Sequence, residues 1–376
     1  MQESFNGFET EKTAEERIYL VGLSQIPGLR LKTVELLLKY FKNFKALWGA
    51  TRKDLEQLTD LPAHFMDNFF KIKNSEDPFA IVGKLRRKNV QVLTLLDSSY
   101  PGSLRQIYDP PLVLYYQGNW SQKDEHMLGI VGSRRTTVYG EKIAEKFGRE
   151  LADAGFTIVS GMARGVDSYA HKGCLNAKGK TIAVLGSGLD VIYPKENAKL
   201  ADEIKSTGLL LTEYPLGTPP LAINFPARNR IIAGLSLGIL VIEAAIKSGA
   251  LITADFAMEL GKEVFAVPGP ITSPNSEGTN SLIKQGAKLV SQVGDILEEY
   301  GFSNKLMPDQ TGSFLKKLSP DESLIYELLG YNALRVEEIA KQTGWSLSKI
   351  QTILTLLELQ GLVEQRPGKQ FIRKSY

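Results

Sequence analysis

The central part of the chain alternates short apolar runs with longer amphipathic stretches. The runs lack a strict alternation of apolar and polar residues, which predicts strands buried on both faces, as in parallel sheets. Between them lie stretches with helical periodicity, such as 140–154 and 197–206. This order predicts a Rossmann-like α/β domain with a doubly wound parallel sheet over 87–300, and edge strands within 90–118. The predicted strands are 127–132, 157–161, 181–186, 209–213, 239–243, 264–268 and 287–290.

The segment before the sheet has the pattern of short helices. Residues 1–82 predict an N-terminal helical domain, with a Pro-Gly turn at 25–29 before an amphipathic stretch. Such a turn resembles half of a helix-hairpin-helix or SAM-like element, whose backbone amides can grip a DNA phosphate. A similar turn follows at 60–62. A small structural helical bundle fits this pattern equally well.

The segment after the sheet begins with a polar stretch, 301–318, that predicts a linker. Residues 319–376 then predict three helices followed by a hairpin, which is typical of a winged-helix domain. This domain has seven Lys or Arg and seven Asp or Glu residues, so it is neutral overall. A protein-interaction role therefore suits it as well as DNA reading. The predicted helices are 321–329, 336–343 and 346–360, and the hairpin is 362–373.

Composition excludes several classes of protein. A single cysteine, Cys174, excludes a disulfide framework and a cysteine-based zinc site, and three scattered histidines do not suggest a metal cluster. We predict no cofactor. The first twenty residues do not resemble a signal peptide, and no apolar run approaches the roughly 20 residues that a membrane span needs. We therefore expect a cytoplasmic protein without a membrane partner. Because the net charge is only +3, any anion-binding surface must be a local patch.

The sequence 225–236 places charge in an unusual position. It predicts a helix with Phe225, Arg228 and Arg230 in its first turns. Cations are disfavoured there, because the N-terminal end of a helix already carries partial positive charge. The arrangement becomes favourable when an anion docks on the free backbone N–H groups, and the aromatic ring offers a face for a base. A turn with two surface arginines is the alternative interpretation.

Glycine-rich loops follow five of the predicted strands. Ligands of such folds lie beyond the carboxyl ends of the strands, where small residues let the backbone approach a phosphate. Arg134, Arg164, Lys195 and Arg228 could converge on this rim. None of the loops has the Walker or the dinucleotide-binding pattern. They are 132–137, 160–165, 186–190, 248–253 and 268–270.

Four acidic residues also lie near strand ends, but no Ser-His-Asp or Cys-His set accompanies them. Carboxylates in such positions commonly cap helices, pair with arginines or support loops. We predict these structural roles, and no catalytic residue, for Asp167, Asp190, Glu213 and Glu243.

Six motifs in order and at the expected spacing resemble the DNA-processing protein A family, called DprA or Smf, which acts in natural transformation. The resemblance covers the whole central segment, and both flanks are similar to domains that accompany it in the family. The motifs are Gly132-Ser-Arg134, Ser160-Gly-Met-Ala-Arg-Gly-Val-Asp167, Ala183-Val-Leu-Gly-Ser-Gly-Leu-Asp190, Tyr193-Pro, Phe225-Pro-x-Arg-Asn-Arg230 and Ser248-Gly-Ala-Leu-Ile-Thr-Ala254.

The resemblance implies a protein that binds incoming single-stranded DNA, protects it from nucleases and helps load RecA recombinase, displacing single-strand-binding protein. It also implies a homodimer. In the implied site Arg134 grips phosphate, Phe225 stacks a base, and Arg228 and Arg230 line the same pocket. Some relatives have a basic residue where this chain has Ala222. The implied DNA-binding residues are Gly132, Ser133, Arg134, Arg164, Lys195, Phe225, Arg228, Asn229 and Arg230.

Two other functions remain open. Rossmann-like phosphoribohydrolases hold a nucleotide at the same edge, but their Pro-Gly-Gly-x-Gly-Thr-x-x-Glu motif has no equivalent at 243–253. Alternatively, the winged helix could read duplex DNA while the sheet domain senses a small molecule. The neutral charge of 319–376 counts against this alternative.

Overall fold

The structure, a computed structural model, describes residues 12–58, 61, 64–120, 126–302, 318–329, 334–359, 362–366 and 370–373. The chain divides into two compact units, Met1–Leu306 and Met307–Tyr376. The predicted linker, 301–318, lies almost entirely outside the described residues, and the predicted turn at 60–62 lies largely outside them.

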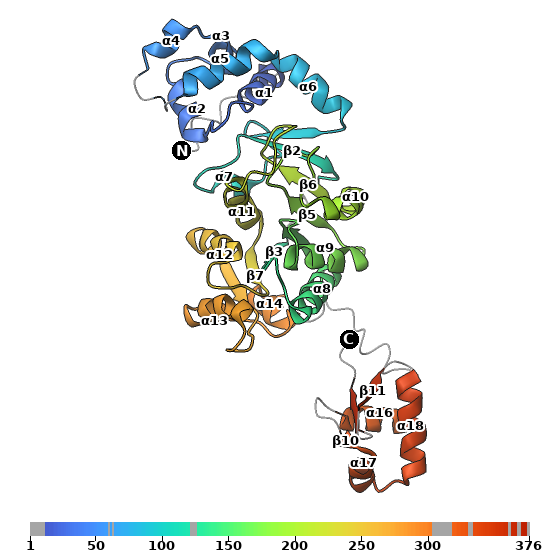
Figure 1. The fold of residues 1–376 in the computed structure, drawn as a ribbon. Helices are drawn as coiled ribbons and strands as arrows, with labels where there is room; N and C mark the ends of the chain where they lie inside the picture. The colour runs from blue at the N-terminus through green and yellow to red at the C-terminus, as the bar shows by residue number, and fades with distance from the viewer. Residues whose placement is uncertain are drawn as a thin grey trace. The chain divides into compact units, whose positions relative to one another are not determined.

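The larger unit is built on a nine-stranded sheet in the order β1-β2-β6-β5-β4-β3-β7-β8-β9 (Figure 1). The seven strands from β6 to β9 in this order are parallel, whereas β2 is antiparallel to both of its neighbours, β6 and the edge strand β1. The prediction of a Rossmann-like sheet with added edge strands is therefore confirmed. The strands are β1 Gln91–Thr94, β2 Val113–Gly118, β3 Met127–Val131, β4 Thr157–Ser160, β5 Thr181–Val184, β6 Leu209–Thr212, β7 Gly238–Val241, β8 Glu263–Ala266 and β9 Lys288–Leu289.

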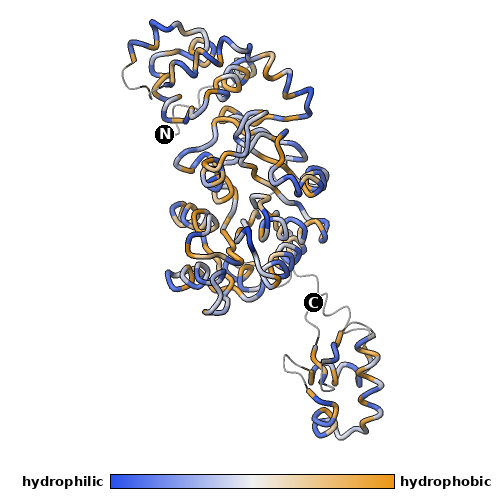
Figure 2. Tube along the Cα trace, viewed as in Figure 1, coloured by the Kyte–Doolittle hydropathy of each residue, from blue (hydrophilic) through white to orange (hydrophobic). Residues whose placement is uncertain are grey.

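Helices cover both faces of this sheet, with α8, α9 and α10 on one side and α11 and α12 on the other (Figure 1). Helices α8 and α9 approach each other closely, since a Cβ atom at Gly148 would overlap the carbonyl of Ala170. The inner strands are completely buried, and Figure 2 shows them as hydrophobic stretches. The helices are α7 Gly102–Arg105, α8 Val138–Asp153, α9 Val166–Asn176, α10 Ala198–Thr207, α11 Asn224–Leu235, α12 Gly249–Glu259, α13 Glu277–Lys284 and α14 Val293–Glu299, with short 3-10 turns at Lys195–Asn197 and Pro274–Ser276.

The N-terminal helices belong to the same compact unit as the sheet. Their apolar faces surround Leu23, Leu37 and Phe69, which are all fully buried. The hydroxyl of Tyr115 on β2 lies 2.7 Å from Ser24 Oγ and accepts a hydrogen bond of 2.9 Å from Gln25 Nε2. The helices are α1 Lys12–Leu23, α2 Leu31–Leu38, α3 Phe44–Gly49, α4 Arg52–Glu56, α5 Phe65–Ser75 and α6 Pro78–Arg87.

The described residues of the smaller unit form three helices and a three-stranded sheet in the order β10-β12-β11. Its core contains Ile325, Ile339, Leu354 and Leu357. The predicted winged helix is thus confirmed, and the short strand β10 was not predicted. The elements are α16 Pro320–Leu328, β10 Leu334–Arg335, α17 Val336–Thr343, α18 Leu347–Leu359, β11 Val363–Arg366 and β12 Gln370–Arg373.

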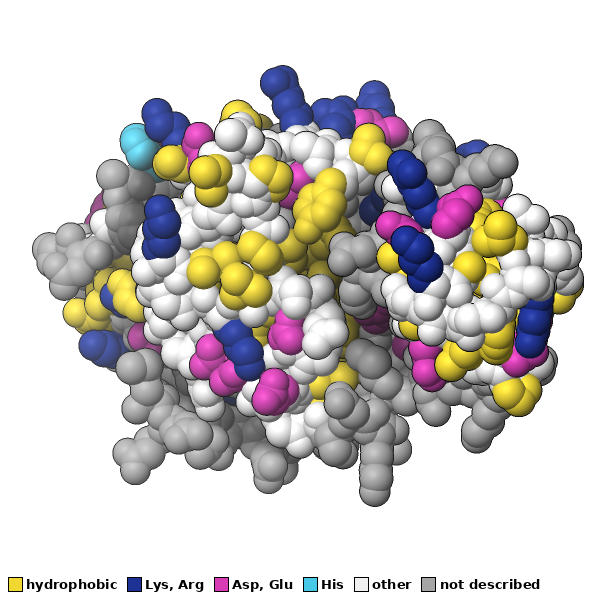
Figure 3. All heavy atoms as spheres, turned by 90° about the horizontal axis from the view of Figure 1, so that it is seen from below, with side chains coloured by type: hydrophobic (Ala, Val, Ile, Leu, Met, Phe, Trp, Pro, Cys, Tyr) yellow, Lys and Arg dark blue, Asp and Glu magenta, His cyan; other side chains and the backbone are white. Residues whose placement is uncertain are grey.

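Charge is distributed without a dominant basic field on the face shown in Figure 3. Lysines and arginines are scattered there among acidic, hydrophobic and uncharged side chains. This distribution agrees with the small net charge of +3, so electrostatic binding of an anion requires a local site. Within the described ranges, no helix has both the length and the apolar character needed to cross a membrane.

Candidate nucleic-acid interface

A cleft of about 750 Å³ opens at the carboxyl end of the parallel strands. Strand β3 lies between β4 and β7. From β3 the chain first adds strands on one side of the sheet and later, from β7 on, adds them on the other, so the strand order reverses at β3. Open α/β sheets bind their ligands at such a switch point. The cleft is lined by Val131, Gly132, Ser133, Arg134, Arg135, Ala163, Asp167, Tyr193, Pro220, Ala222, Phe225, Pro226, Arg228, Asn229, Ile232, Ala245, Lys247, Ser248, Gly249, Ala250, Thr253 and Asn275.

The loop after β3 is held in place by a buried carboxylate. Glu243, which follows β7, accepts hydrogen bonds from Thr136 Oγ1 at 2.7 Å, from the Thr137 amide at 2.9 Å and from Thr137 Oγ1 at 2.5 Å. The backbone carbonyl of Glu243 also accepts from the Ser133 amide at 2.7 Å. The loop is therefore fixed at both of its ends.

Two cations project from this fixed loop. Arg134 and Arg135 are both exposed, and both line the cleft. Gly132 allows the loop to pass closely over α9, because a Cβ atom there would lie 2.6 Å from Val166 Cγ2. The site thus presents charge on a rigid support, so little conformational freedom is lost when an anion binds.

Phe225, at the start of α11, provides an aromatic surface beside these cations. The Arg134 guanidinium carbon lies 5.1 Å from the centroid of the Phe225 ring, within the range of a cation–π contact. The Tyr193 ring lies 5.6 Å away on a centroid-to-centroid measure. Gly186 leaves room for the ring, since a Cβ atom there would lie 2.9 Å from Phe225 Cδ1.

Arg228 does not present a free cation, in contrast to our expectation. Its side chain reaches the floor of the cleft but is only 3% exposed. One guanidinium nitrogen, Nη1, donates to the Gly161 carbonyl at 2.8 Å and also to the Val184 carbonyl. Burial lowers the pKa of Arg228 to about 10, against the opposing effect of Asp167 nearby. The residue joins α11 to the ends of β4 and β5.

Arg230 does not line the cleft, which corrects the expectation that it shares a pocket with Arg228. Its guanidinium makes two hydrogen bonds to the Glu213 carboxylate, at 2.5 and 2.6 Å. Its Nε donates to the Asp109 carbonyl at 2.8 Å. Burial alone would lower the pKa of Arg230, but the bond to Glu213 raises it. All of these contacts are internal, because Arg230 is turned toward the loop before β2.

Arg164 and Lys195 also lie outside the cleft lining, so the expected convergence of four cations is only half realised. Arg164 is exposed and bonded to the Glu196 carboxylate, and Lys195 is exposed beside that acid. Asn229 does line the cleft, where its Nδ2 donates to the Gly249 carbonyl at 3.2 Å.

Sequence reasoning missed Lys247 as a member of the site. Lys247 is exposed and lines the cleft from the loop between β7 and α12. This loop follows the carboxyl end of β7, so the rule that brought the other loops together could have identified it.

The four acids near the strand ends have the structural contacts that we predicted. Glu243 supports the β3 loop and Glu213 binds Arg230, as described above. Asp167 accepts from the Gly161 amide at 3.1 Å and the Ala163 amide at 3.3 Å. Asp190 accepts from the Gly217 amide at 2.7 Å and from Lys88 Nζ at 2.8 Å.

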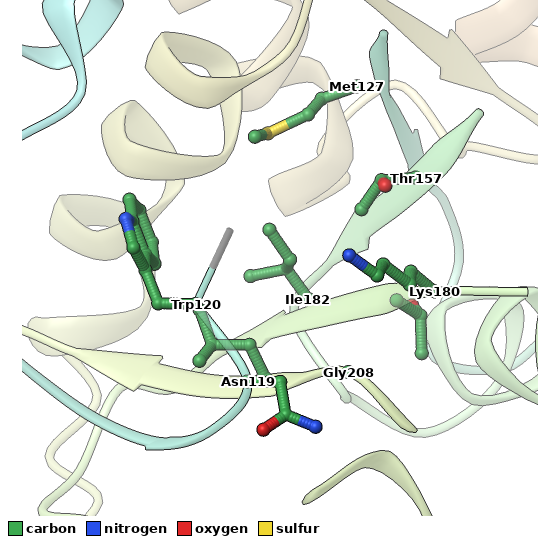
Figure 4. A pocket seen from close by; sticks show the side chains of 9 residues that line it. Asn119, Trp120, Met127, Thr157, Lys180, Ile182 and Gly208 are labelled. Atoms are coloured by element: carbon green, nitrogen blue, oxygen red, sulfur yellow. The ribbon is translucent and has the colours of Figure 1, made fainter. Parts of the chain in front are cut away.

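A much smaller cavity, of about 10 Å³, lies at the opposite end of the strands (Figure 4). It has room for about one water molecule, so it is not a ligand site. Among the described residues, no group of three or more His, Cys, Asp or Glu side chains is placed to hold a metal ion. The residues that line this cavity include Asn119, Trp120, Met127, Thr157, Lys180, Ile182 and Gly208 (Figure 4).

The fold and the cleft define a class: Rossmann-like α/β proteins with an open site at the switch point, here followed by a winged-helix unit. The family described as DNA recombination-mediator protein A matches residues 91–301 of this chain. The family described as the DprA winged helix domain matches 314–369. The chain therefore belongs to the DNA recombination-mediator protein A (DprA/Smf) family, which confirms the resemblance seen in the sequence.

Individual relatives agree with this assignment. Protein Smf of a Synechocystis species is 34% identical, over 96% of this chain and 99% of its own length. The X-ray structure of DprA from Streptococcus pneumoniae superposes with a TM-score of 0.65 and 40% identity, over 75% of this chain and 97% of that chain. A structure that concerns the single-stranded DNA binding mode of DprA from Helicobacter pylori has a TM-score of 0.51 and 33% identity, over 56% and 95% of the two chains.

Proposed function

We propose that this protein binds single-stranded DNA in the cleft at the carboxyl end of its sheet. We further propose that it protects the strand and helps load RecA recombinase onto it as a homodimer, displacing single-strand-binding protein. The Helicobacter pylori relative, which is similar over 56% of this chain, has a described single-stranded DNA binding mode. The proposal for DNA binding is supported by this likeness and by the chemistry of the cleft.

The contact between Arg134 and Phe225 is the observation that carries the proposal. A ring with a cation 5.1 Å from its centroid combines a stacking surface for a base with a partner for the neighbouring phosphate. Stacking on an aromatic side chain contributes about 1–3 kcal/mol per base and tolerates any base. In a duplex the faces of the bases are already stacked, so this site favours an unpaired strand.

The surrounding cations add a term that does not depend on sequence. Arg134, Arg135 and Lys247 are exposed around the cleft and can each meet a phosphate. Each phosphate that they neutralise releases counterions, which makes affinity fall steeply with salt. Arg228 and Arg230 support this site from within the protein through their internal hydrogen bonds.

The two alternative functions receive less support from the same residues. Glu243 is the acid that an enzyme would use at this edge, and both of its carboxylate oxygens bind the β3 loop. In α18, the single cation Lys349 pairs with Asp321 at 2.7 Å and lies 3.8 Å from the centroid of the Trp345 ring. The exposed face of α18 is thus poor in free positive charge, which suits a protein partner better than duplex DNA.

Equilibrium binding to a fluorescent oligothymidine strand tests the proposal. We expect Phe225→Ala to weaken binding about tenfold, because it removes one stacking contact, and Phe225→Trp to retain affinity. Phe79→Ala serves as the control, since Phe79 is an exposed phenylalanine on α6, outside the cleft lining. Equal binding by wild type and Phe225→Ala would contradict the placement of the site, and failure of the wild type to bind would contradict the function.

The recombinase part of the proposal needs its own assay. We expect the wild-type protein to accelerate assembly of RecA filaments on strands already covered by single-strand-binding protein. Phe225→Ala should lose this effect at protein concentrations at which the variant does not bind the strand. Strand binding without any acceleration would confine the function to protection.

A further inference from the structure

A second exposed aromatic ring lies next to cations, in the loop between α7 and β2. Tyr108 is 80% exposed, more than any aromatic side chain that lines the cleft. The amine of Lys32, on α2, lies 4.5 Å from the centroid of its ring and donates to its hydroxyl at 2.6 Å. The ring is therefore oriented by a cation while most of its surface remains open to solvent.

A second cation stands close to the same loop. Arg30 immediately precedes α2, and its side chain is 67% exposed. It pairs with Asp109 at 3.4 Å, so it lies beside the residue that follows Tyr108. The Asp109 side chain is only 18% exposed and also lies 3.9 Å from Arg230, so this carboxylate faces two arginines while most of the Arg30 side chain remains open to solvent and to an added phosphate.

The small area that Tyr108 buries argues against a mainly structural role. The N-terminal helices are attached to the sheet by other contacts, including the buried Tyr115 and its hydrogen-bonding partners Ser24 and Gln25. An 80% exposed ring contributes little to that attachment, because apolar stabilisation follows the area removed from water. An aromatic face that is kept in water beside two cations is instead suited to stacking.

Internal hydrogen bonds connect this loop to the cleft. Arg230 on α11 donates from Nε to the Asp109 carbonyl at 2.8 Å, which fixes the backbone next to Tyr108. Phe225 is five residues earlier on the same helix, so about 7.5 Å of helix rise separates it from Arg230. The helix that carries Phe225 and the loop that carries Tyr108 are thus joined by a direct hydrogen bond within one compact unit.

We propose that Tyr108, with Lys32 and Arg30, forms a second contact for the same single strand, in which Tyr108 stacks a base and the two cations meet phosphates. This inference rests on the proposed binding of single-stranded DNA in the cleft. It extends the binding track from the sheet onto the N-terminal helical segment, and it requires the strand to be long enough to occupy both places.

The length of the DNA strand distinguishes the contact at the cleft from the contact at Tyr108, in an experiment with the full chain. We compare binding of an oligothymidine of about four nucleotides, which can occupy only one contact, with one of about 20 nucleotides. Tyr108→Ala is expected to bind the long strand about tenfold more weakly and the short strand as the wild type does. Tyr108→Phe keeps the ring and is expected to bind both strands normally.

Two further variants complete the design. Tyr40→Ala is the matched control, since Tyr40 is 62% exposed and lies two residues after α2, outside the loop of Tyr108. Lys32→Gln is expected to reduce the salt slope of long-strand binding by about one, because one phosphate contact is lost.

Each outcome supports or overturns the second contact. Unchanged long-strand binding by both Tyr108→Ala and Lys32→Gln overturns it, and would leave the residues as a contact between α2 and the sheet unit. Equal weakening of both strand lengths by Tyr108→Ala also overturns it, because the effect would then act through the cleft. If the wild type binds neither strand, the function proposed for the cleft has failed as well, which the short strand alone reveals.

Discussion

The loop after β3 and the first turns of α11 carry the same kind of side chain but use it in opposite ways. Arg134 and Arg135 on the loop are exposed at the cleft. Arg228 and Arg230 on the helix donate to acceptors inside the protein. The comparison teaches that an arginine near the ends of parallel strands is free for a ligand only when no internal acceptor takes its donors first.

The acceptors explain which arginines are consumed. The carbonyls of Gly161 and Val184 lie at the ends of β4 and β5, where the ladder of the sheet stops, and Arg228 satisfies both. Buried carbonyls rarely remain unpaired, so a donor is required there. Near the β3 loop the internal acceptor is the Glu243 carboxylate, and it is already paired with hydroxyl and amide donors of the loop itself. The arginines of that loop therefore stay available.

The largest effect on stability is expected at Arg228. We expect Arg228→Ala to lower the free energy of unfolding by about 3–5 kcal/mol, because it leaves the buried Asp167 carboxylate without its cationic neighbour. Two carbonyls would also lose their donor, which adds to the cost. Urea unfolding of the wild type and the variant measures the difference.

A double variant tests the cause of that loss. Replacing both partners, as in Arg228→Met with Asp167→Asn, should recover part of the stability, since no uncompensated charge then remains buried. If Arg228→Ala unfolded at the same urea concentration as the wild type, the buried arginine would have no structural role and the comparison would fail.

The next effect concerns His171, a buried residue of α9 that the same arginine influences. Burial, with a smaller contribution from Arg228, lowers the pKa of His171 to about 3. The unfolded chain takes up this proton near pH 6.5, whereas the folded chain resists it. The contribution of neutral His171 to the free energy of unfolding is therefore fully present above about pH 6.5. It decreases on acidification, by at most about 1.4 kcal/mol per pH unit.

The measurement is the slope of unfolding free energy against pH between about 7 and 5.5, where few other groups titrate. His171→Asn retains a polar atom for the hydrogen bond with Thr181, whose Oγ1 lies 2.6 Å from His171 Nδ1. This variant should flatten the slope, whatever its absolute stability. An unchanged slope would mean that another group controls the acid sensitivity.

The fold was largely predictable because its signals are local and repeated. Each inner strand is an apolar run bounded by glycine or polar residues, and the structure places β3 to β8 within a residue or two of the predicted starts. The two edge strands were expected only as a region, because 90–118 contains turns that interrupt its pattern. Strand β10 has only two residues, Leu334–Arg335, which is too short for any periodicity to appear.

The candidate site was predictable in its location but not in its membership. The order of strands and helices places Gly132, Phe225 and the loops at one edge, whichever side chains they carry. Whether Arg228 points into the cleft or into the protein depends on the carbonyls of Gly161 and Val184, which are distant in sequence. The rule places the loop of Lys247 at this edge as well, but the sequence around Lys247 does not show whether its side chain lines the cleft.

The smallest effect on stability is expected at Arg134, the exposed counterpart of Arg228. Its guanidinium is exposed and contacts the Phe225 ring, so Arg134→Ala should change the free energy of unfolding by less than about 0.5 kcal/mol. The Arg134→Ala variant should instead bind all single strands more weakly, and the salt slope of its binding should be reduced by about one, because one phosphate contact is lost. Salt titrations with strands of different base composition, beside urea unfolding of the same samples, measure both quantities. A loss confined to particular sequences would show that Arg134 reads bases, and a large loss of stability would place it with Arg228 among the internal arginines.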